Sequence, residues 1–209
     1  MALIPCKAIE FNGMDVEHRR HYFMQGIDEP DPPGDEAVFW AHYRESDCSY
    51  PERTGDLRSV LMTTDFSTLY ENRQTPIYVE YFGPLDQDHA MDASLPDDPG
   101  RLLRLILFRG RADPDFTERD RALLILLRPH LHAAHQQVLR RRLGIPELTN
   151  RQWELLRLVE AGLSNTQIAR RLHVADNTVR KHLENIFERL QVLSRTAAVA
   201  RAFPGRLLP

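Results

Sequence analysis

Four side chains that can bind phosphates and base edges recur near the C-terminus at the spacing of one helical face. They follow one another at intervals of three, one and three residues: Thr178, Lys181, His182 and Asn185. Their hydroxyl, amide and cationic groups suit the hydrogen bonds that nucleic acids offer. An apolar stripe with steps of four, three and four runs along the other side: Val179, Leu183, Ile186 and Leu190. The pattern predicts a helix with one face for a core and one for nucleic acid.

Three further helices would hold this one in place. Ser164 and Gln167 have the spacing of a capping box, which predicts a short helix to about residue 172 and therefore a helix-turn-helix over 164–190. Thr149 and Gln152 repeat that spacing before a helix that ends at Gly162. A fourth helix begins after Ser194 and closes before Pro204-Gly205. The C-terminal third is expected to be an all-α unit of four helices.

In this arrangement the sequence resembles the LuxR-type (FixJ/NarL-like) DNA-binding domain of bacterial transcription regulators. The resemblance runs from about residue 148 to 203 without a gap. It rests on Leu148, Thr149, Arg151, Glu154, Leu156, Gly162, Ser164, Asn165, Ile168, Ala169, Leu172, Thr178, Val179, His182, Asn185, Ile186, Leu190, Val192 and Arg195.

The resemblance implies that the third helix lies in the major groove of double-stranded DNA. The DNA-binding residues that it implies are Asn165, Thr166, Thr178, Val179, Arg180, Lys181, His182, Asn185 and Arg189. It also implies a homodimer with Val199 and Ala202 in the dimer contact, and RNA polymerase as a further partner. Glu154 is expected to pair within the domain, with an arginine such as Arg195 or Arg189.

Three positions depart from the family pattern. Ala175 stands where a capping Ser is usual, so Asp176 would have to cap the helix. Gln191 replaces a common Gly and would have to adopt a left-handed conformation. Trp153 replaces a charged residue, and the alternatives are a half-exposed side chain or an anchor against the N-terminal part.

The charge balance separates the two ends of the chain. Residues 148–209 hold 10 Lys and Arg against 5 Asp and Glu, a net charge of +5, whereas residues 1–147 hold 17 against 25, a net charge of −8. A basic module joined to an acidic body suits a DNA-binding protein. No apolar run approaches the length that spans a bilayer and no signal peptide is evident, so we expect a cytoplasmic protein.

The N-terminal part of the sequence predicts a mixture of helices and strands. The expected fold is therefore an α+β domain followed by an all-α domain. Strands are expected at 6–11 and 17–24, joined by an Asn12-Gly13 hairpin turn, and at 59–64, 77–82, 89–95 and 102–109. A loop at 30–34 precedes a helix over 37–44, and a short helix covers 66–73. The longest helix is expected over 117–143, buried through Leu123, Leu124, Leu127, Leu131 and Val138, with Pro129 kinking or splitting it.

This order of elements resembles a GAF- or PAS-like sensor domain. The local pieces 39–43, 54–56, 77–82 and 116–121 are similar to the N-terminal halves of actinobacterial LuxR-type regulators. We therefore divide the chain into a GAF-like sensor or dimerisation domain at 1–143, a linker at 144–147 and a DNA-binding domain at 148–209. Trp40, Tyr43 and Tyr50 are the candidates for lining a ligand cavity, with packing in an aromatic core as the alternative.

Other functions fit the N-terminal half less well. A phosphorylated receiver domain needs a late lysine, but Lys7 and Lys181 are the only lysines. A domain for acyl-homoserine lactones needs a second tryptophan, and Trp153 lies outside it. No cofactor or metal is expected, since His130, His132 and His135 do not converge on one helix face. The sequence shows no catalytic motif, so a regulator with an unknown ligand or with protein contacts alone is preferred to an enzyme.

Overall fold

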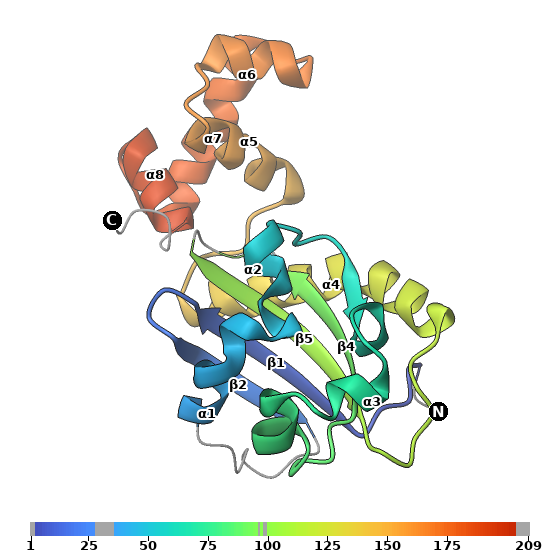
Figure 1. Ribbon diagram of the computed structural model, residues 1–209. Coiled ribbons are helices and arrows are strands. Elements are labelled where there is room, and N and C mark those ends of the chain that lie inside the picture. Colours follow the sequence, from blue (N-terminus) through green and yellow to red (C-terminus); the bar gives the residue numbers. More distant parts are fainter. Residues whose placement is uncertain (1–2, 28–35, 96, 98–99, 204–209) are drawn as a thin grey trace. The chain divides into compact units, whose positions relative to one another are not determined.

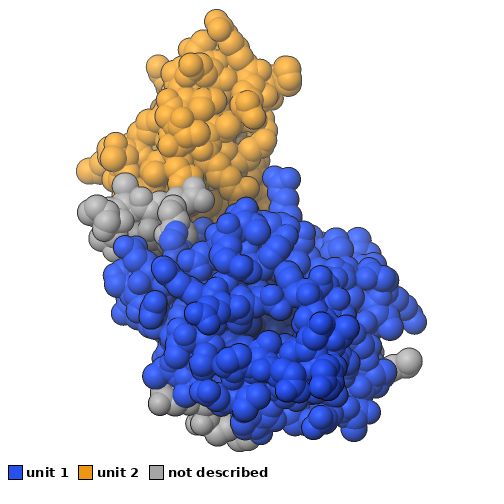
Figure 2. Space-filling view, viewed as in Figure 1, with its two compact units in different colours: residues 1–133 blue, residues 134–209 orange. Residues whose placement is uncertain are grey.

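The computed structural model describes residues 3–27, 36–95, 97 and 100–203. The chain divides into two compact units, Met1–Ala133 and Ala134–Pro209, which Figure 2 colours separately. The division falls inside helix α4 (Glu118–Arg142), ten residues before the domain end expected from the sequence at 143. The expected loop at 30–34 and the Pro204-Gly205 end lie outside the described residues.

The first unit is built on a five-stranded antiparallel sheet. Its strands are β1 (Ala8–Asp15), β2 (Arg20–Ile27), β3 (Val60–Met62), β4 (His89–Leu95) and β5 (Arg101–Arg109), and their spatial order is β2-β1-β5-β4-β3. The central strands β1 and β5 pair along their whole length, from Ala8 opposite Phe108 to Asp15 opposite Arg101. The longest strand, β5, therefore lies in the middle of the sheet and the shortest strand, β3, forms an edge.

Helices cover both faces of this sheet (Figure 1). On one face α4 packs through Leu124 against a core that includes Met91 and Leu107. On the other face lie α1 (Glu36–His42), α2 (Tyr50–Thr54), α3 (Leu69–Asn72) and short 3-10 turns at Tyr43–Glu45, Asp47–Ser49 and Thr63–Asp65. Phe39 and Trp40 of α1 are buried there. Because successive strand residues point to opposite faces, β4 and β5 contribute side chains to both layers.

Most of the expected elements are confirmed, but the position of the first turn is wrong. Asn12 and Gly13 lie inside β1, opposite Met24 and Phe23 of β2 and also opposite strand β5. The chain reverses at 16–19 instead, where Arg19 is left-handed with φ 48°. A Cβ at position 13 would lie 2.1 Å from Cζ of Tyr22, so a larger residue there would have to displace the Tyr22 side chain. Pairing on both sides thus overrides the local preference of Asn-Gly for a turn.

The strand expected at 77–82 is also wrong. Tyr78–Phe82 form a π-helical turn, η4, closed by a 2.7 Å hydrogen bond from the Gly83 amide to the Tyr78 carbonyl. Ile77 and Tyr81 are buried while Val79 is exposed. Burial therefore follows a helical spacing of four rather than the alternation of a strand.

Helix α4 is continuous through Pro129, so the expected splitting does not occur. Its first turn is capped as expected, because the Asp120 carboxylate accepts a 2.9 Å hydrogen bond from the Thr117 amide. Leu124 is buried, but Leu131 and Val138 are exposed, which corrects their assignment to the core.

Candidate nucleic-acid interface and ligand pocket

The second unit contains the four expected helices: α5 (Asn150–Glu160), α6 (Asn165–Leu172), α7 (Asp176–Leu190) and α8 (Arg195–Ala202). Both predicted capping boxes are present, so that Thr149 accepts a hydrogen bond from the Gln152 amide and Ser164 from the Gln167 amide. The predicted apolar stripe of α7 is buried: Val179, Leu183, Ile186 and Leu190. It packs in one core with α5, α6 and α8, which fixes the orientation of α7 within the unit.

The opposite face of α7 is exposed and polar. Thr178, Lys181 and Asn185 are exposed there, Arg180 is exposed beside them, and His182 is half-buried. Within the described part of the chain, no hydrogen bond or ion pair engages the side chains of Thr178, Lys181 or Asn185. A hydroxyl, an ammonium and an amide are thus available to an external partner.

Val179 does not belong to this face. Its side chain is fully buried in the helical core, so it packs α7 against the unit and cannot reach a nucleic acid. Ala202, predicted in a dimer contact, is only 5% exposed and also belongs to the core. Val199 is half-buried against that core. The spacing along one helix predicted these positions, but it does not distinguish a residue at the edge of the helical core from a residue on the surface.

The start of α6 is tied to its neighbours. Asn165 Oδ1 accepts a 3.2 Å hydrogen bond from Arg195, whose guanidinium also donates to the Leu163 carbonyl. The Thr166 hydroxyl donates to Asp176 Oδ2 at 2.6 Å. These bonds position the first turns of α6 and α7, and they place a carboxylate beside the helix start where the sequence predicts a phosphate contact.

Two charged residues near the interface, Arg189 and Glu154, have partners inside the unit. Arg189 donates to the Glu147 carbonyl at 3.0 Å, which ties the end of α7 to the predicted linker. Glu154 pairs with Arg151 at 2.6 Å, which confirms a pairing with an arginine inside the domain, although the partner is neither Arg195 nor Arg189. Arg151 lies one helical turn before Glu154, and a local pair of this kind needs no long side chain from another helix.

Both unusual ends of α7 are visible in the structure. Ala175 is the N-cap and makes no side-chain cap bond, while the neighbouring Asp176 is held by Thr166. Gln191 adopts the left-handed conformation that the sequence requires, with φ 56° and ψ 47°. Trp153 is buried rather than half-exposed: it lies against Phe203, and the Arg140 guanidinium carbon is 3.8 Å from the ring centre.

Comparison with known proteins assigns this unit to a family. Residues 146–202 match the family described as bacterial regulatory proteins, luxR family. The chain carries a luxR-family DNA-binding domain.

Two solved structures resemble the chain more broadly. The LBD domain of VqsR from Pseudomonas aeruginosa is 19% identical over 62% of this chain and 74% of its own, with a TM-score of 0.47. Escherichia coli SdiA is 19% identical over 96% of this chain and 84% of its own, with a TM-score of 0.32.

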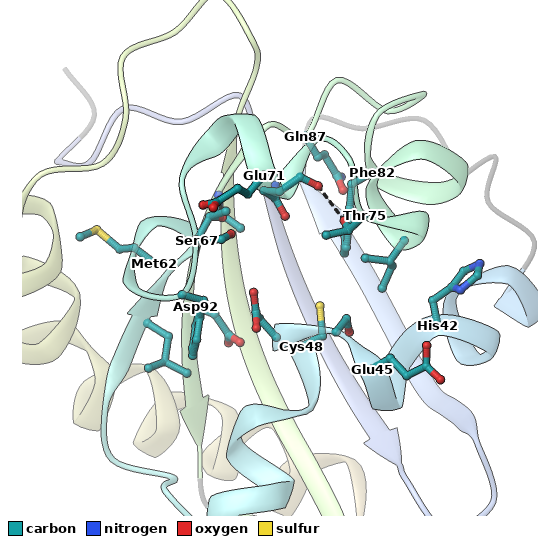
Figure 3. A pocket seen from close by; sticks show the side chains of 18 of the residues that line it. His42, Glu45, Cys48, Met62, Ser67, Glu71, Thr75, Phe82, Gln87 and Asp92 are labelled. Carbon is teal, nitrogen blue, oxygen red and sulfur yellow. Dashed lines mark hydrogen bonds between the residues drawn. The ribbon is translucent and has the colours of Figure 1, made fainter.

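The first unit contains a pocket of about 390 Å³ between the sheet and the helical turns that cover it (Figure 3). Strands β3, β4 and β5 form its floor, and the segments 42–48 and 63–77 form most of its walls. Its apolar lining includes Leu61, Phe66, Ile77, Phe82 and Phe108. Such a volume suits a small organic molecule.

A buried ion pair lies in the floor of this pocket. Asp92 of β4 and Arg104 of β5 are 7% and 4% exposed, and Asp92 Oδ2 accepts a hydrogen bond from Arg104 Nη2. Arg104 Nη1 donates to the Cys48 carbonyl at 3.2 Å. Burial opposes the positive charge, but Asp92 outweighs burial and raises the pKa of Arg104 above its ordinary value. Burial also raises the pKa of the adjacent Cys48 thiol, which keeps it protonated.

The aromatic residues proposed from the sequence do not line this pocket. Trp40 and Tyr43 are buried among Phe39 and Tyr81, and Trp40 donates a 3.0 Å hydrogen bond to Glu36. Tyr50 packs against Phe66. Asp92 and Arg104 line the pocket but were not predicted from the sequence. A charged residue between apolar neighbours in each of two predicted strands could have indicated them.

The described residues contain no group of three His, Cys, Asp or Glu side chains arranged to hold a metal ion. No helix within the described ranges is both long and apolar enough to cross a membrane.

Proposed function

We propose that this chain is a sequence-specific transcription regulator that reads the major groove of DNA with the exposed face of α7. One observation carries the proposal: Thr178, Lys181 and Asn185 are exposed and unpaired within the described structure, opposite a stripe that is buried. Side chains of these types bind phosphates and base edges when a helix enters the groove. The net charge of +5 over residues 148–209, from 10 basic and 5 acidic residues, supplies the attraction to the backbone.

The side chains divide into two roles. Asn185 and the exposed part of His182 face the base edges. The Asn185 amide can both donate and accept a hydrogen bond at one base. Lys181, Arg180 and Thr178 bind phosphates or guanine. Asn165 and Arg189 contribute through the side-chain donors that their bonds inside the domain leave free. The Thr166 hydroxyl proton is donated to Asp176, so Thr166 contributes through its backbone amide in the first turn of α6.

The protein acts as a homodimer on a palindromic site, with two recognition helices about one turn of DNA apart. Val199 of α8 remains available for the dimer contact, since it is half-buried, whereas Ala202 does not. In this role the protein works in the cytoplasm and contacts RNA polymerase at its promoters.

The test is DNA binding by the full chain to a site selected from a random pool. Lys181→Ala should weaken binding and lower the slope of log K against log salt by about 0.9, because one phosphate contact is lost. Arg157→Ala is the matched control, since it removes one exposed charge from α5 rather than α7. Equal effects of the two substitutions, or binding that does not depend on salt, would contradict the assignment of the α7 face.

We further propose that the first unit is a GAF/PAS-like sensory domain whose pocket binds a small molecule. The five-stranded antiparallel sheet covered by helices and the 390 Å³ pocket support this role. A second candidate is a module for dimerisation or other protein contacts that binds no ligand. The exposed apolar side chains of α4, among them Ile125 and Leu126, favour it. Ile125→Glu would dissociate a dimer held by α4 in sedimentation and leave a ligand-sensing domain intact.

A further inference from the structure

We propose that the pocket of the first unit takes a neutral molecule with an apolar body and one hydroxyl head group, which hydrogen-bonds to the Asp92–Arg104 pair. This inference rests on the proposed sensory role of that unit. It adds the chemical class of the ligand and the two residues that select it.

The floor of the pocket leaves one acceptor and one donor unused. The side chains of Asp92 and Arg104 are 9% and 5% exposed. Their mutual bond uses Asp92 Oδ2 and Arg104 Nη2, while Arg104 Nη1 is used by the Cys48 carbonyl. Asp92 Oδ1 and Arg104 Nε are buried and have no partner among the described residues. Buried polar atoms of this kind are rare in folded proteins and indicate a missing partner.

A hydroxyl group satisfies both atoms. Its proton is donated to Asp92 Oδ1, and its oxygen accepts the proton of Arg104 Nε–H. Because both functions reside on one atom, a single hydroxyl can join two neighbouring groups of one ion pair. Ser67, whose hydroxyl is also buried without a partner in the described structure, offers a further contact from the wall of the pocket.

The charge of the pocket selects against ions. Asp92 and Arg104 already neutralise one another, so a charged head group at the floor of the pocket would add a buried charge that this pair does not balance. Glu45, Asp47 and Glu71 lie exposed among the lining residues, and their carboxylates further disfavour an anion. Figure 3 shows Glu45 and Glu71 on different sides of the pocket, with Asp92 between the sheet and its cover.

The body of the ligand is apolar. Phe66, Phe82 and Phe108 line the pocket together with Leu61 and Ile77, and they would exclude water from the head group. A volume of about 390 Å³ accommodates a phenyl ring on a short alkyl chain.

The experiment compares four compounds that share a phenylbutyl body: 4-phenylbutan-1-ol, butylbenzene, 4-phenylbutanoate and 4-phenylbutylammonium. Each is titrated into the full chain labelled at isoleucine δ1-methyl groups. The Ile77 methyl reports on the pocket, and Ile168 and Ile186 in the helical core serve as internal controls. The alcohol should shift Ile77 and bind about tenfold more tightly than the hydrocarbon, and more tightly than either ion.

A double variant tests the anchoring pair. Asp92→Leu with Arg104→Met removes both charges at once, a replacement that buried ion pairs often tolerate. It should still bind butylbenzene but lose the tenfold advantage of the alcohol. The control Arg151→Gln with Glu154→Gln removes an ion pair from the other unit and should keep that advantage.

The outcomes separate the two proposals. If butylbenzene binds as tightly as the alcohol, or an ion binds more tightly, the proposed hydroxyl head group is wrong. The pocket would still be a ligand-binding site in that case. If none of the compounds shifts Ile77 while the chain still binds its DNA site, the pocket is not a ligand site of this class and the sensory role fails with it. An alcohol advantage that persists in the double variant would overturn the role of Asp92 and Arg104.

Discussion

Replacing Ala175 with Ser is expected to stabilise the helical unit by about 1 kcal/mol. Ala175 is the N-cap of α7 and already has the extended backbone that a cap needs, with φ −75° and ψ 148°. Its methyl group cannot accept a hydrogen bond, whereas the caps of α5, α6 and α8 all do so. Only the side chain is therefore missing from this cap.

The magnitude follows from the other three caps. The hydroxyl oxygens of Thr149, Ser164 and Ser194 lie 3.3, 3.3 and 3.1 Å from the amides that they accept. A serine hydroxyl at 175 would reach the first turn of α7 in the same way. Asp176 does not already fill this role, because its carboxylate accepts the Thr166 hydroxyl. A stabilisation of about 1 kcal/mol from one such bond corresponds to about fivefold slower hydrogen exchange of the protected amides.

The assay is amide hydrogen exchange of the full chain, read at Leu183 and Ile186. Both are buried residues of α7, so their exchange reports on opening of the helical core. Ala161→Ser is the matched control, because Ala161 is exposed at the C-terminal end of α5 and has no helix start to cap. Equal slowing in the two variants, or no slowing in Ala175→Ser, would refute the capping argument.

Three further effects are expected. Gln191→Gly should raise the unfolding free energy of the helical unit by about 1 kcal/mol, because Gly relieves the left-handed strain at φ 56°; urea denaturation measures it. Arg140→Ala should lower that energy by about 0.5–2 kcal/mol, since the guanidinium carbon lies 3.8 Å from the Trp153 ring centre. Burial lowers the pKa of His21 despite its hydrogen bonds to Glu36. The unfolded chain therefore binds a proton more readily, so stability is fully present above pH about 6.5 and declines as the pH falls from there toward the folded-state pKa. His21→Asn should flatten this decline between pH 7.5 and 5.5.

Each effect has its own check. Gln191→Ala retains the strain and should not stabilise the unit as Gly does. Arg141→Ala removes a neighbouring charge whose pair with Glu147 is exposed, so it should change stability less than Arg140→Ala. A pH dependence that is the same in the His21 variant as in the parent chain would argue against the buried imidazole as its source.

The helical unit could be predicted from the sequence almost completely. The capping boxes that begin at Thr149 and Ser164 each span four residues at the start of a helix. The apolar stripe of α7 likewise repeats within a single helix. The predictions that were wrong in this unit concern residues that are covered by a second helix. Val179 and Ala202 are buried because neighbouring helices cover them, which the spacing along one helix does not show.

The sheet was harder because strand pairing joins distant residues. Asn12-Gly13 signals a turn locally, yet β5, about 90 residues further along the chain, pairs with it and holds it extended. The pattern at 77–82 suits a strand as well as a helix, and the exposure of Val79 between the buried Ile77 and Tyr81 decides for the helix. Short apolar segments of this kind are ambiguous until their neighbours are known.

The sequence by itself determined that residues 146–202 form a luxR-type unit of four helices, because that unit is specified by local periodicity and caps. Only the tertiary structure decided that Asp92 and Arg104 meet at the floor of a pocket. They lie on separate strands, and each has an apolar residue on either side in the sequence. Their pairing is a consequence of antiparallel register, which places Ser94 opposite Arg104 and so brings Asp92 to the same face two residues away.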